Sequence, residues 1–201
     1  MDTVFFDVDT QFDFMDPEGT LYVPGSQEIA ANVRRLLEYA TQAGIATVSS
    51  MDAHLVDDPE FKRFTPHCVD GTPGQRRCFE NLPRLPRKLW RSDATVSSGD
   101  LTIDPGHHYL VHKRTFSMFA NPWMQGLREQ GAFRGVPAVV FGVATDVCVL
   151  YDALDLCQAG ACVRVVRDAI AGIAAEDTER AIRQMQDAGA TFVNTDRVVR
   201  A

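Results

Sequence analysis

The sequence predicts an α/β fold in three α/β/α layers around a six-stranded parallel sheet, and three observations lead to this prediction. Short apolar runs alternate along the chain with segments whose apolar residues recur at helical spacing. The runs are short and continuous, which is typical of strands covered on both faces. The 201 residues, 45% of them apolar, suffice for one sizeable core, and no repeat or linker divides them. We therefore expect a single domain over residues 1–201.

The N-terminal part contains two predicted strands and one long helix. Thr3–Val8 is a short apolar run that ends at Asp9, and Ile45–Met51 is the second such run. Between them, apolar residues recur at helical spacing from Ile29 to Ala40. Gly44 follows at the position where a helix C-terminus favours glycine.

The C-terminal part repeats this alternation after a long break. Residues 52–107 hold six of the ten prolines and show no long helix, so we expect an irregular insertion that carries functional residues. Beyond it, the predicted strands are 109–112, 138–143, 162–166 and 191–193. The predicted helices are 122–130, 147–158 and 176–188.

Charge and composition exclude several classes of protein. Lys plus Arg total 20 and Asp plus Glu total 27, a net charge of −7 that disfavours nucleic-acid binding. No apolar run reaches the length of a membrane span, and the N-terminal residues lack the basic leader of a signal peptide. Five cysteines without zinc-finger spacing indicate a reducing compartment. We expect a cytoplasmic protein with a small-molecule partner; a homo-oligomer is not excluded.

Reactive side chains follow four of the predicted strands. In open parallel sheets, ligands bind beyond the carboxyl ends of the strands. Asp9 follows the first strand, Asp52 and His54 the second, Lys113 the third and Cys148 the fourth. Each residue also has a purely structural interpretation: Asp9 as an acid that caps a loop, Lys113 as a solvated charge at the edge of the sheet, and Cys148 as a buried apolar side chain. Together they predict a catalytic site at this edge.

Cys148 is the predicted nucleophile of this site. A thiol at a helix N-terminus lies near the positive end of the helix dipole and near free backbone N–H groups, which favour the thiolate and can bind an oxyanion. Asp9 is the predicted proton acceptor, because its strand is expected to lie next to that of Cys148. We expect Lys113 to balance their charges and to lower the pKa values of both.

A divalent metal site is predicted beside the nucleophile. Asp52 and His54 are two residues apart, so on an extended chain they point the same way. His67 returns from the irregular segment as a third donor, and Glu60 is a candidate fourth. The alternative is that Asp52 and His54 form an ordinary hydrogen-bonded pair.

A second motif favours a different enzyme class. Asp7-Val8-Asp9-Thr10 after an apolar strand, with the acidic segment Gly99–Asp104, resembles a haloacid-dehalogenase-like phosphatase. That pattern requires Thr or Val where this chain has Gln11. It also leaves Cys148 and the histidines without a role, so this is the weaker hypothesis.

With these residues assembled, the chain resembles the isochorismatase-like cysteine hydrolases, and within them the nicotinamidases. The matches run in order along almost the whole chain. They are Asp9-Thr10-Gln11-Phe12-Asp13-Phe14, Asp52-x-His54, the segment Pro66–Gly74, Lys113, and Gly142-Val143-Ala144-Thr145-Asp146-Val147-Cys148-Val149.

The resemblance implies roles for particular residues. Asp9, Lys113 and Cys148 would be catalytic, with the amides of Ala144 and Cys148 as the oxyanion hole and a cis peptide between Val143 and Ala144. Asp52, His54 and His67 would hold one divalent ion (Zn, Mn or Fe), with Glu60 where the family often has another histidine. The implied aromatic pocket consists of Phe14, Phe64, Phe116 and Phe119.

The resemblance implies a cysteine amidohydrolase, with nicotinamide to nicotinate plus ammonia, a reaction of NAD salvage, as the best single reaction. Arg114–Phe119 resembles the isochorismatase version of this segment, so hydrolysis of another small amide or of a vinyl ether is an alternative. A non-catalytic ligand-binding relative is the alternative of another class.

Overall fold

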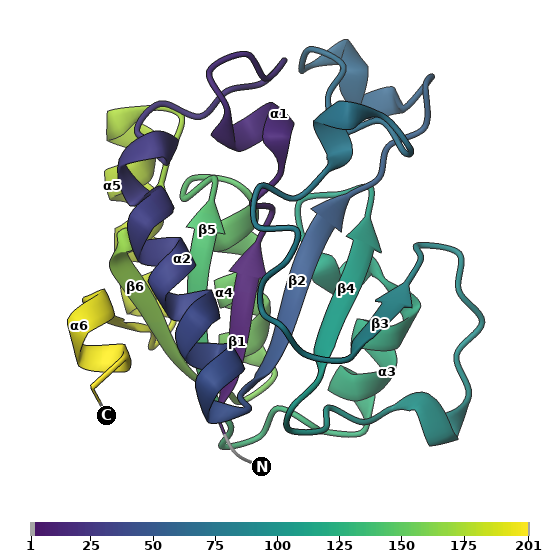
Figure 1. Ribbon diagram of the computed structural model, residues 1–201, viewed down its shortest axis with the longest axis vertical. Helices are drawn as coiled ribbons and strands as arrows, with labels where there is room; N and C mark the ends of the chain where they lie inside the picture. The colour runs from purple at the N-terminus through teal and green to yellow at the C-terminus, as the bar shows by residue number, and fades with distance from the viewer. Residues whose placement is uncertain (1–2, 201) are drawn as a thin grey trace.

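Seven strands form one parallel sheet in the computed structural model, which describes residues 3–200 (Figure 1). The strand order is β3-β4-β2-β1-β5-β6-β7, and all neighbouring pairs are parallel. The strands are β1 (Val4–Val8), β2 (Ala46–Asp52), β3 (Arg87–Trp90), β4 (His108–Lys113), β5 (Pro137–Val143), β6 (Cys162–Ala171) and β7 (Thr191–Val193).

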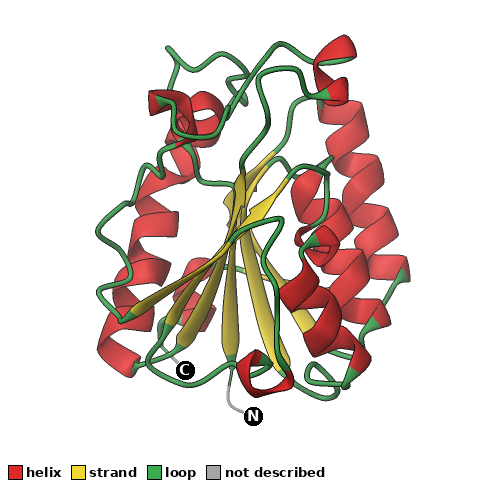
Figure 2. Ribbon diagram, turned by 90° about the vertical axis from the view of Figure 1, so that its right-hand side faces the viewer, coloured by secondary structure: helices red, strands yellow, loops and turns green. Residues whose placement is uncertain are grey.

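Helices cover both faces of the sheet, which confirms the predicted three-layer fold (Figure 2). They are α1 (Phe12–Met15), α2 (Ser26–Ala43), α3 (Pro122–Glu129), α4 (Cys148–Gln158), α5 (Ala175–Asp187) and α6 (Thr195–Val198). Four short 3-10 helices, η1 (Pro59–Lys62), η2 (Pro73–Gln75), η3 (Ser98–Asp100) and η4 (Met118–Ala120), lie in the connections.

The strand count is the one correction to the predicted sheet. β3 lies within the segment that we expected to be irregular, and it pairs with β4 at the edge of the sheet. Three of its four residues are exposed. An edge strand needs no continuous apolar run, because only one side of its backbone is paired and its faces are partly solvated. Its sequence therefore lacks the signal that identified the other six strands.

The core divides into two apolar layers, one on each side of the sheet. In β1, Val4, Phe6 and Val8 pack with residues of α3, α4 and α5, whereas Phe5 packs with α2 on the other side. This alternation follows from the period of two along a strand. Both faces of β1 are buried, and four of its five residues are apolar, which accounts for the apolar run seen in the sequence; the exception is the buried acid Asp7.

The carboxyl ends of the central strands are held close together by Gly142. This residue has φ +121°, and a Cβ there would collide with the carbonyl oxygen of Val8 in the neighbouring strand. Glycine is needed where two backbones approach so closely. The contact places the residue after β1 beside the loop that connects β5 to α4. Within residues 3–200, no helix is both long enough and apolar enough to cross a membrane.

Candidate active site

Four chemically reactive side chains meet at the carboxyl edge of the sheet, as the sequence predicted. Asp9 directly follows β1, Asp52 and Lys113 end β2 and β4, and Cys148 begins α4. All four are buried. Because β1 and β2 lie between β4 and β5, the topology brings residues that are up to 139 positions apart into contact.

Lys113 is the centre of this group. Its Nζ lies 2.8 Å from Asp9 Oδ2, 2.5 Å from Asp52 Oδ1 and 3.5 Å from Cys148 Sγ. The second oxygen of Asp9 accepts a hydrogen bond of 2.7 Å from Ser50 Oγ, which in turn accepts the Asp9 N–H. Ser50 therefore orients Asp9, a role that the sequence did not indicate.

Burial sets the protonation states of the group. It raises the pKa of the Cys148 thiol well above its usual range, against the attraction of Lys113. It also raises the pKa of Asp9, although Lys113 opposes this. Burial alone would lower the pKa of Lys113, but Asp52 and Asp9 raise it instead. Lys113 thus acts to lower both pKa values, as expected, but desolvation outweighs it and both pKa values are raised. The arrangement favours a neutral thiol next to a carboxylate and an ammonium group.

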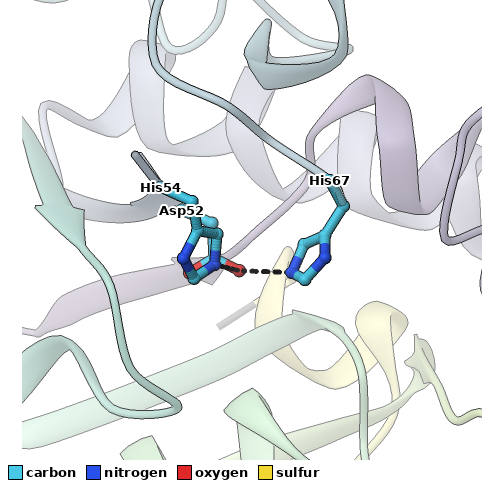
Figure 3. Close-up of side chains that lie close together, drawn as sticks. All are labelled: Asp52, His54 and His67. Atoms are coloured by element: carbon cyan, nitrogen blue, oxygen red, sulfur yellow. Dashed lines mark ion pairs between the residues drawn. The ribbon is translucent and has the colours of Figure 1, made fainter. Parts of the chain in front are cut away.

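Asp52 also belongs to a second group, which it forms with His54 and His67 (Figure 3). The Nε2 atoms of His54 and His67 lie 3.6 Å and 3.8 Å from Asp52 Oδ2. The Oε1 atom of Glu60 lies 3.9 Å from His67 Nε2. The sequence thus predicted which residues converge here, including the return of His67 from the loop.

The donor atoms of this group fit a divalent ion. His67 Nδ1 lies 2.7 Å from the carbonyl of Thr65, which places the proton there and leaves Nε2 free. Neither ring nitrogen of His54 has a well-aligned hydrogen bond; Nδ1 lies 3.0 Å from Asp58 Oδ2, and Nε2 lies farther from a carboxylate, 3.6 Å from Asp52 Oδ2. Burial raises the pKa of Asp52, but Lys113 and His54 outweigh this and hold it at about 2, so the carboxylate is charged. Two imidazole nitrogens and a carboxylate are suitable ligands for Zn, Mn or Fe.

Two side chains of the first motif hold the segments that carry these ligands. Gln11 Oε1 accepts the backbone N–H of Asp52 at 2.8 Å, and its Nε2 donates to the Asp52 carbonyl at 2.9 Å. Asp13 Oδ2 accepts the N–H of Cys68, next to His67, at 2.7 Å. A side chain on Gly74 would collide with the Asp13 carboxylate. The motif was visible in the sequence, but these partners were not.

An apolar pocket joins the two groups. Its empty volume, open solvent included, is about 370 Å³, and its lining includes Cys148, Ala144, Asp52, Glu60 and His67. Phe14, Phe64 and Phe116 line it; that they contact the substrate stays a prediction. The rings of Phe64 and Phe116 meet edge to face, with centroids 6.3 Å apart.

Phe119 does not belong to this pocket, so that prediction is wrong. It is buried in the core with its ring 5.5 Å from that of Phe133. The short helix η4 turns it away from the site, and Ser117 caps this helix by accepting the Phe119 N–H. Phe116 precedes the turn and stays at the pocket.

The connection between β5 and α4 has the expected geometry. The peptide between Val143 and Ala144 is cis. The Ala144 carbonyl accepts the N–H groups of Val147 and Val149, both at 3.1 Å. The N–H of Cys148, in the first turn of α4, has no acceptor within its own helix. The oxyanion hole of Ala144 and Cys148 remains a prediction.

Two acids of the phosphatase-like motif, Asp7 and Asp100, have structural partners. Asp7 is buried, where it pairs with Arg77 and accepts a hydrogen bond of 2.8 Å from Ser49. Asp100 closes the capping box of η3 with Ser97.

Known proteins share this fold, and some are similar in sequence over almost the whole chain. The nicotinamidase of Escherichia coli (strain K12) is 29% identical over 203 residues, covering 92% of this chain and 91% of that protein. The nicotinamidase/pyrazinamidase of Mycobacterium tuberculosis (strain ATCC 25618 / H37Rv) is 29% identical over 202 residues, covering 92% and 95%. The pyrazinamidase of Pyrococcus horikoshii, solved in complex with zinc, is 26% identical with a TM-score of 0.75 over 96% and 99% of the two chains. The isochorismatase domain matches residues 3–197, and the chain therefore belongs to the isochorismatase family.

Proposed function

We propose that this enzyme, a hydrolase that acts on amide C–N bonds, converts nicotinamide and water to nicotinate and ammonia. The observation that carries the proposal is the contact of Lys113 with both Asp9 and Cys148, next to a pocket that also reaches Asp52 and His67. The similarity to nicotinamidases over more than nine-tenths of the chain supports the choice of substrate.

The reaction begins with the neutral thiol. Asp9 accepts the Cys148 proton as Sγ attacks the carboxamide carbon, and the raised pKa of this carboxyl makes it the stronger base. The amides of Ala144 and Cys148 bind the oxyanion. Asp9 then delivers the proton to the departing ammonia, which leaves a thioester on Cys148. Water hydrolyses this thioester with Asp9 as base, and Lys113 stabilises the Asp9 carboxylate whenever it is ionised.

The second group would hold one divalent ion through Asp52, His54 and His67, with Glu60 bound directly or through water. Such an ion supplies a Lewis acid that binds a heteroaromatic nitrogen or orients a water molecule. Two nitrogen and two oxygen donors suit Zn, Mn and Fe alike. The similarity to a pyrazinamidase solved with zinc supports a metal here.

The pocket favours a small planar amide. Phe14 and Phe64 provide flat apolar walls on which a ring can stack. Among the residues that line the pocket, none is arginine, which disfavours a substrate with two carboxylates such as isochorismate. The aliphatic side chains around the aromatic walls offer no hydrogen-bond donors to a phosphate group.

An ammonia-release assay over a panel of amides tests the proposal. With Zn, Mn or Fe added, nicotinamide and pyrazinamide should exceed benzamide and aliphatic amides in kcat/KM. Benzamide is the matched control because it lacks only the ring nitrogen. Faster turnover of an aliphatic amide or of isochorismate would contradict the nicotinamidase assignment, while leaving the family unchanged. No turnover of any compound would favour a ligand-binding relative.

A further inference from the structure

Asp58 is a buried acid in an exposed part of the chain. Its neighbours Asp57 and Pro59 are exposed, whereas Asp58 is 9% exposed. Its Oδ2 atom lies 3.0 Å from His54 Nδ1. Its Oδ1 atom accepts the backbone N–H of Glu60 at 3.0 Å. One carboxylate therefore contacts two of the residues that we propose to bind the metal.

The first contact, which is shorter than the 3.6 Å from His54 Nε2 to Asp52 Oδ2, bears on which nitrogen of His54 carries the proton. A carboxylate can only accept a hydrogen bond, so it favours the tautomer with the proton on Nδ1. Nε2 then keeps its lone pair and faces Asp52 Oδ2. His67 reaches the same state through the carbonyl of Thr65. In both rings, Nε2 is the nitrogen that faces Asp52 Oδ2.

The second contact holds the backbone of Glu60, and with it the position from which the Glu60 side chain extends. Asp58 is the N-cap of η1, and Glu60 is the second residue of this helix. The cap fixes the first turn, whose next residue, Phe61, packs against the His54 ring with centroids 5.3 Å apart. The turn and the imidazole are thus held to each other through Asp58 and Phe61.

We propose that Asp58 is a positioning residue for the metal site, which holds His54 in its Nε2-binding tautomer and Glu60 in place at the same time. This inference rests on the proposed function, because it concerns the proposed ligands. Two N–H donors approach the two oxygens of one carboxylate. Asparagine offers one acceptor and one NH₂ donor, so it satisfies only one of them. The substitution Asp58→Asn therefore changes the site with almost no change of shape.

The test compares Asp58→Asn with Asp57→Asn, which removes the same charge from the exposed neighbouring position. The affinity of each purified protein for Zn²⁺ is measured by competition with a chelator. We expect Asp58→Asn to weaken Zn²⁺ binding by about 10- to 100-fold, the usual effect of losing such a partner. Asp57→Asn should stay within about threefold of the parent protein, since it keeps both contacts of Asp58.

The tautomer is measured separately, from the ¹⁵N chemical shifts of His54 in the metal-free parent protein. The proton should be on Nδ1; a proton on Nε2 would overturn the inference even if Asp58→Asn failed to fold. Equal Zn²⁺ affinity of the two variants would also overturn it. Failure of the proposed metal site itself has a different signature, because the parent protein would then bind neither Zn²⁺ nor Mn²⁺ nor Fe²⁺.

Discussion

Burial governs the chemistry of Cys148 more strongly than its place at the start of a helix. The helix N-terminus favours a thiolate, but the side chain is 7% exposed and its pKa is raised well above the usual range. The thiol therefore needs a base at the moment of attack. Asp9 is buried in the same group and has a raised pKa of its own. In the proposed reaction, one carboxyl therefore carries out both proton transfers.

Replacement of Cys148 by Ala should abolish turnover without unfolding the protein. The sulfur forms the covalent bond in the proposed reaction, and loss of a nucleophile typically costs several decades in kcat. Ammonia release and circular dichroism check the two parts of the prediction. Cys157→Ala, on the same helix, is the matched control and should remain active. A folded Cys148→Ala protein with activity within about tenfold of the parent would contradict the assignment.

The raised pKa of Asp9 should appear in the pH profile. A base must be deprotonated, so kcat/KM should fall as the pH drops through the pKa of Asp9. Because burial raises this pKa, the acid limb should lie above 3.8, the ordinary value. The check is kcat/KM between pH 4 and 8, with folding monitored. Asp9→Asn should lower the rate about 10²- to 10⁴-fold and remove the limb. An unchanged limb in that variant would assign the base elsewhere.

At the scale of the strands, a buried polar network links β1, β2 and β4. Ser49 Oγ donates to Asp7 Oδ2 and lies 2.9 Å from His108 Nε2. Arg77 pairs with Asp7. His108 is the first residue of β4 and is fully buried. Burial, with Arg77 and Arg87 nearby, lowers the pKa of His108 to about 2.

His108 should therefore make the protein less stable in mild acid. The ring stays neutral in the folded state, whereas in the unfolded chain it gains a proton below its ordinary pKa of 6.5. Stability from this residue is complete above pH 6.5 and is lost as the pH falls below it. Between pH 7.5 and 5.0 the loss is about 2 kcal/mol.

Urea unfolding of the parent protein and of His108→Gln at these two pH values measures this effect. Glutamine is neutral and keeps a donor for Ser49, so the variant should lose less stability between the two pH values, by about 2 kcal/mol. His107→Gln, one residue earlier and outside the network, should retain the parent's pH dependence. If the free energy of unfolding depended on pH equally in all three proteins, His108 would be protonated to the same extent in the folded and unfolded states.

For the whole molecule, the sequence predicts what local patterns and strand ends determine. The run Thr3–Val8 marked a central strand, and the rule that parallel strands present their carboxyl ends at one edge correctly predicted that Asp9, Lys113 and Cys148 meet. The edge strand β3 was not predicted, because its exposed residues show no apolar pattern. Phe119 was misplaced because an aromatic residue near a site looks the same in sequence whether it faces the pocket or the core.

Residues that act through others were the hardest to predict. Gln11 and Asp13 hold backbone groups of Asp52 and Cys68, which lie 41 and 55 positions away. Ser50 orients Asp9 across a strand pair. Such contacts depend on register and loop path, which no local spacing contains. The sequence thus predicts the reacting groups better than the groups that hold them.

The metal should couple the site to the stability of the whole chain. Asp52 and His54 lie at the end of β2, whereas His67 lies in a loop held to α1 through Asp13. An ion bound to all three stabilises only the folded state, by about 2.7 kcal/mol at a hundredfold excess over its Kd. For a chain of this size that corresponds to a rise in Tm of about 5–10 °C. Differential scanning fluorimetry with Zn²⁺ or Mn²⁺, and with chelator, measures it. The double variant His54→Ala/His67→Ala should show no rise; an equal rise there would place the stabilising ion elsewhere.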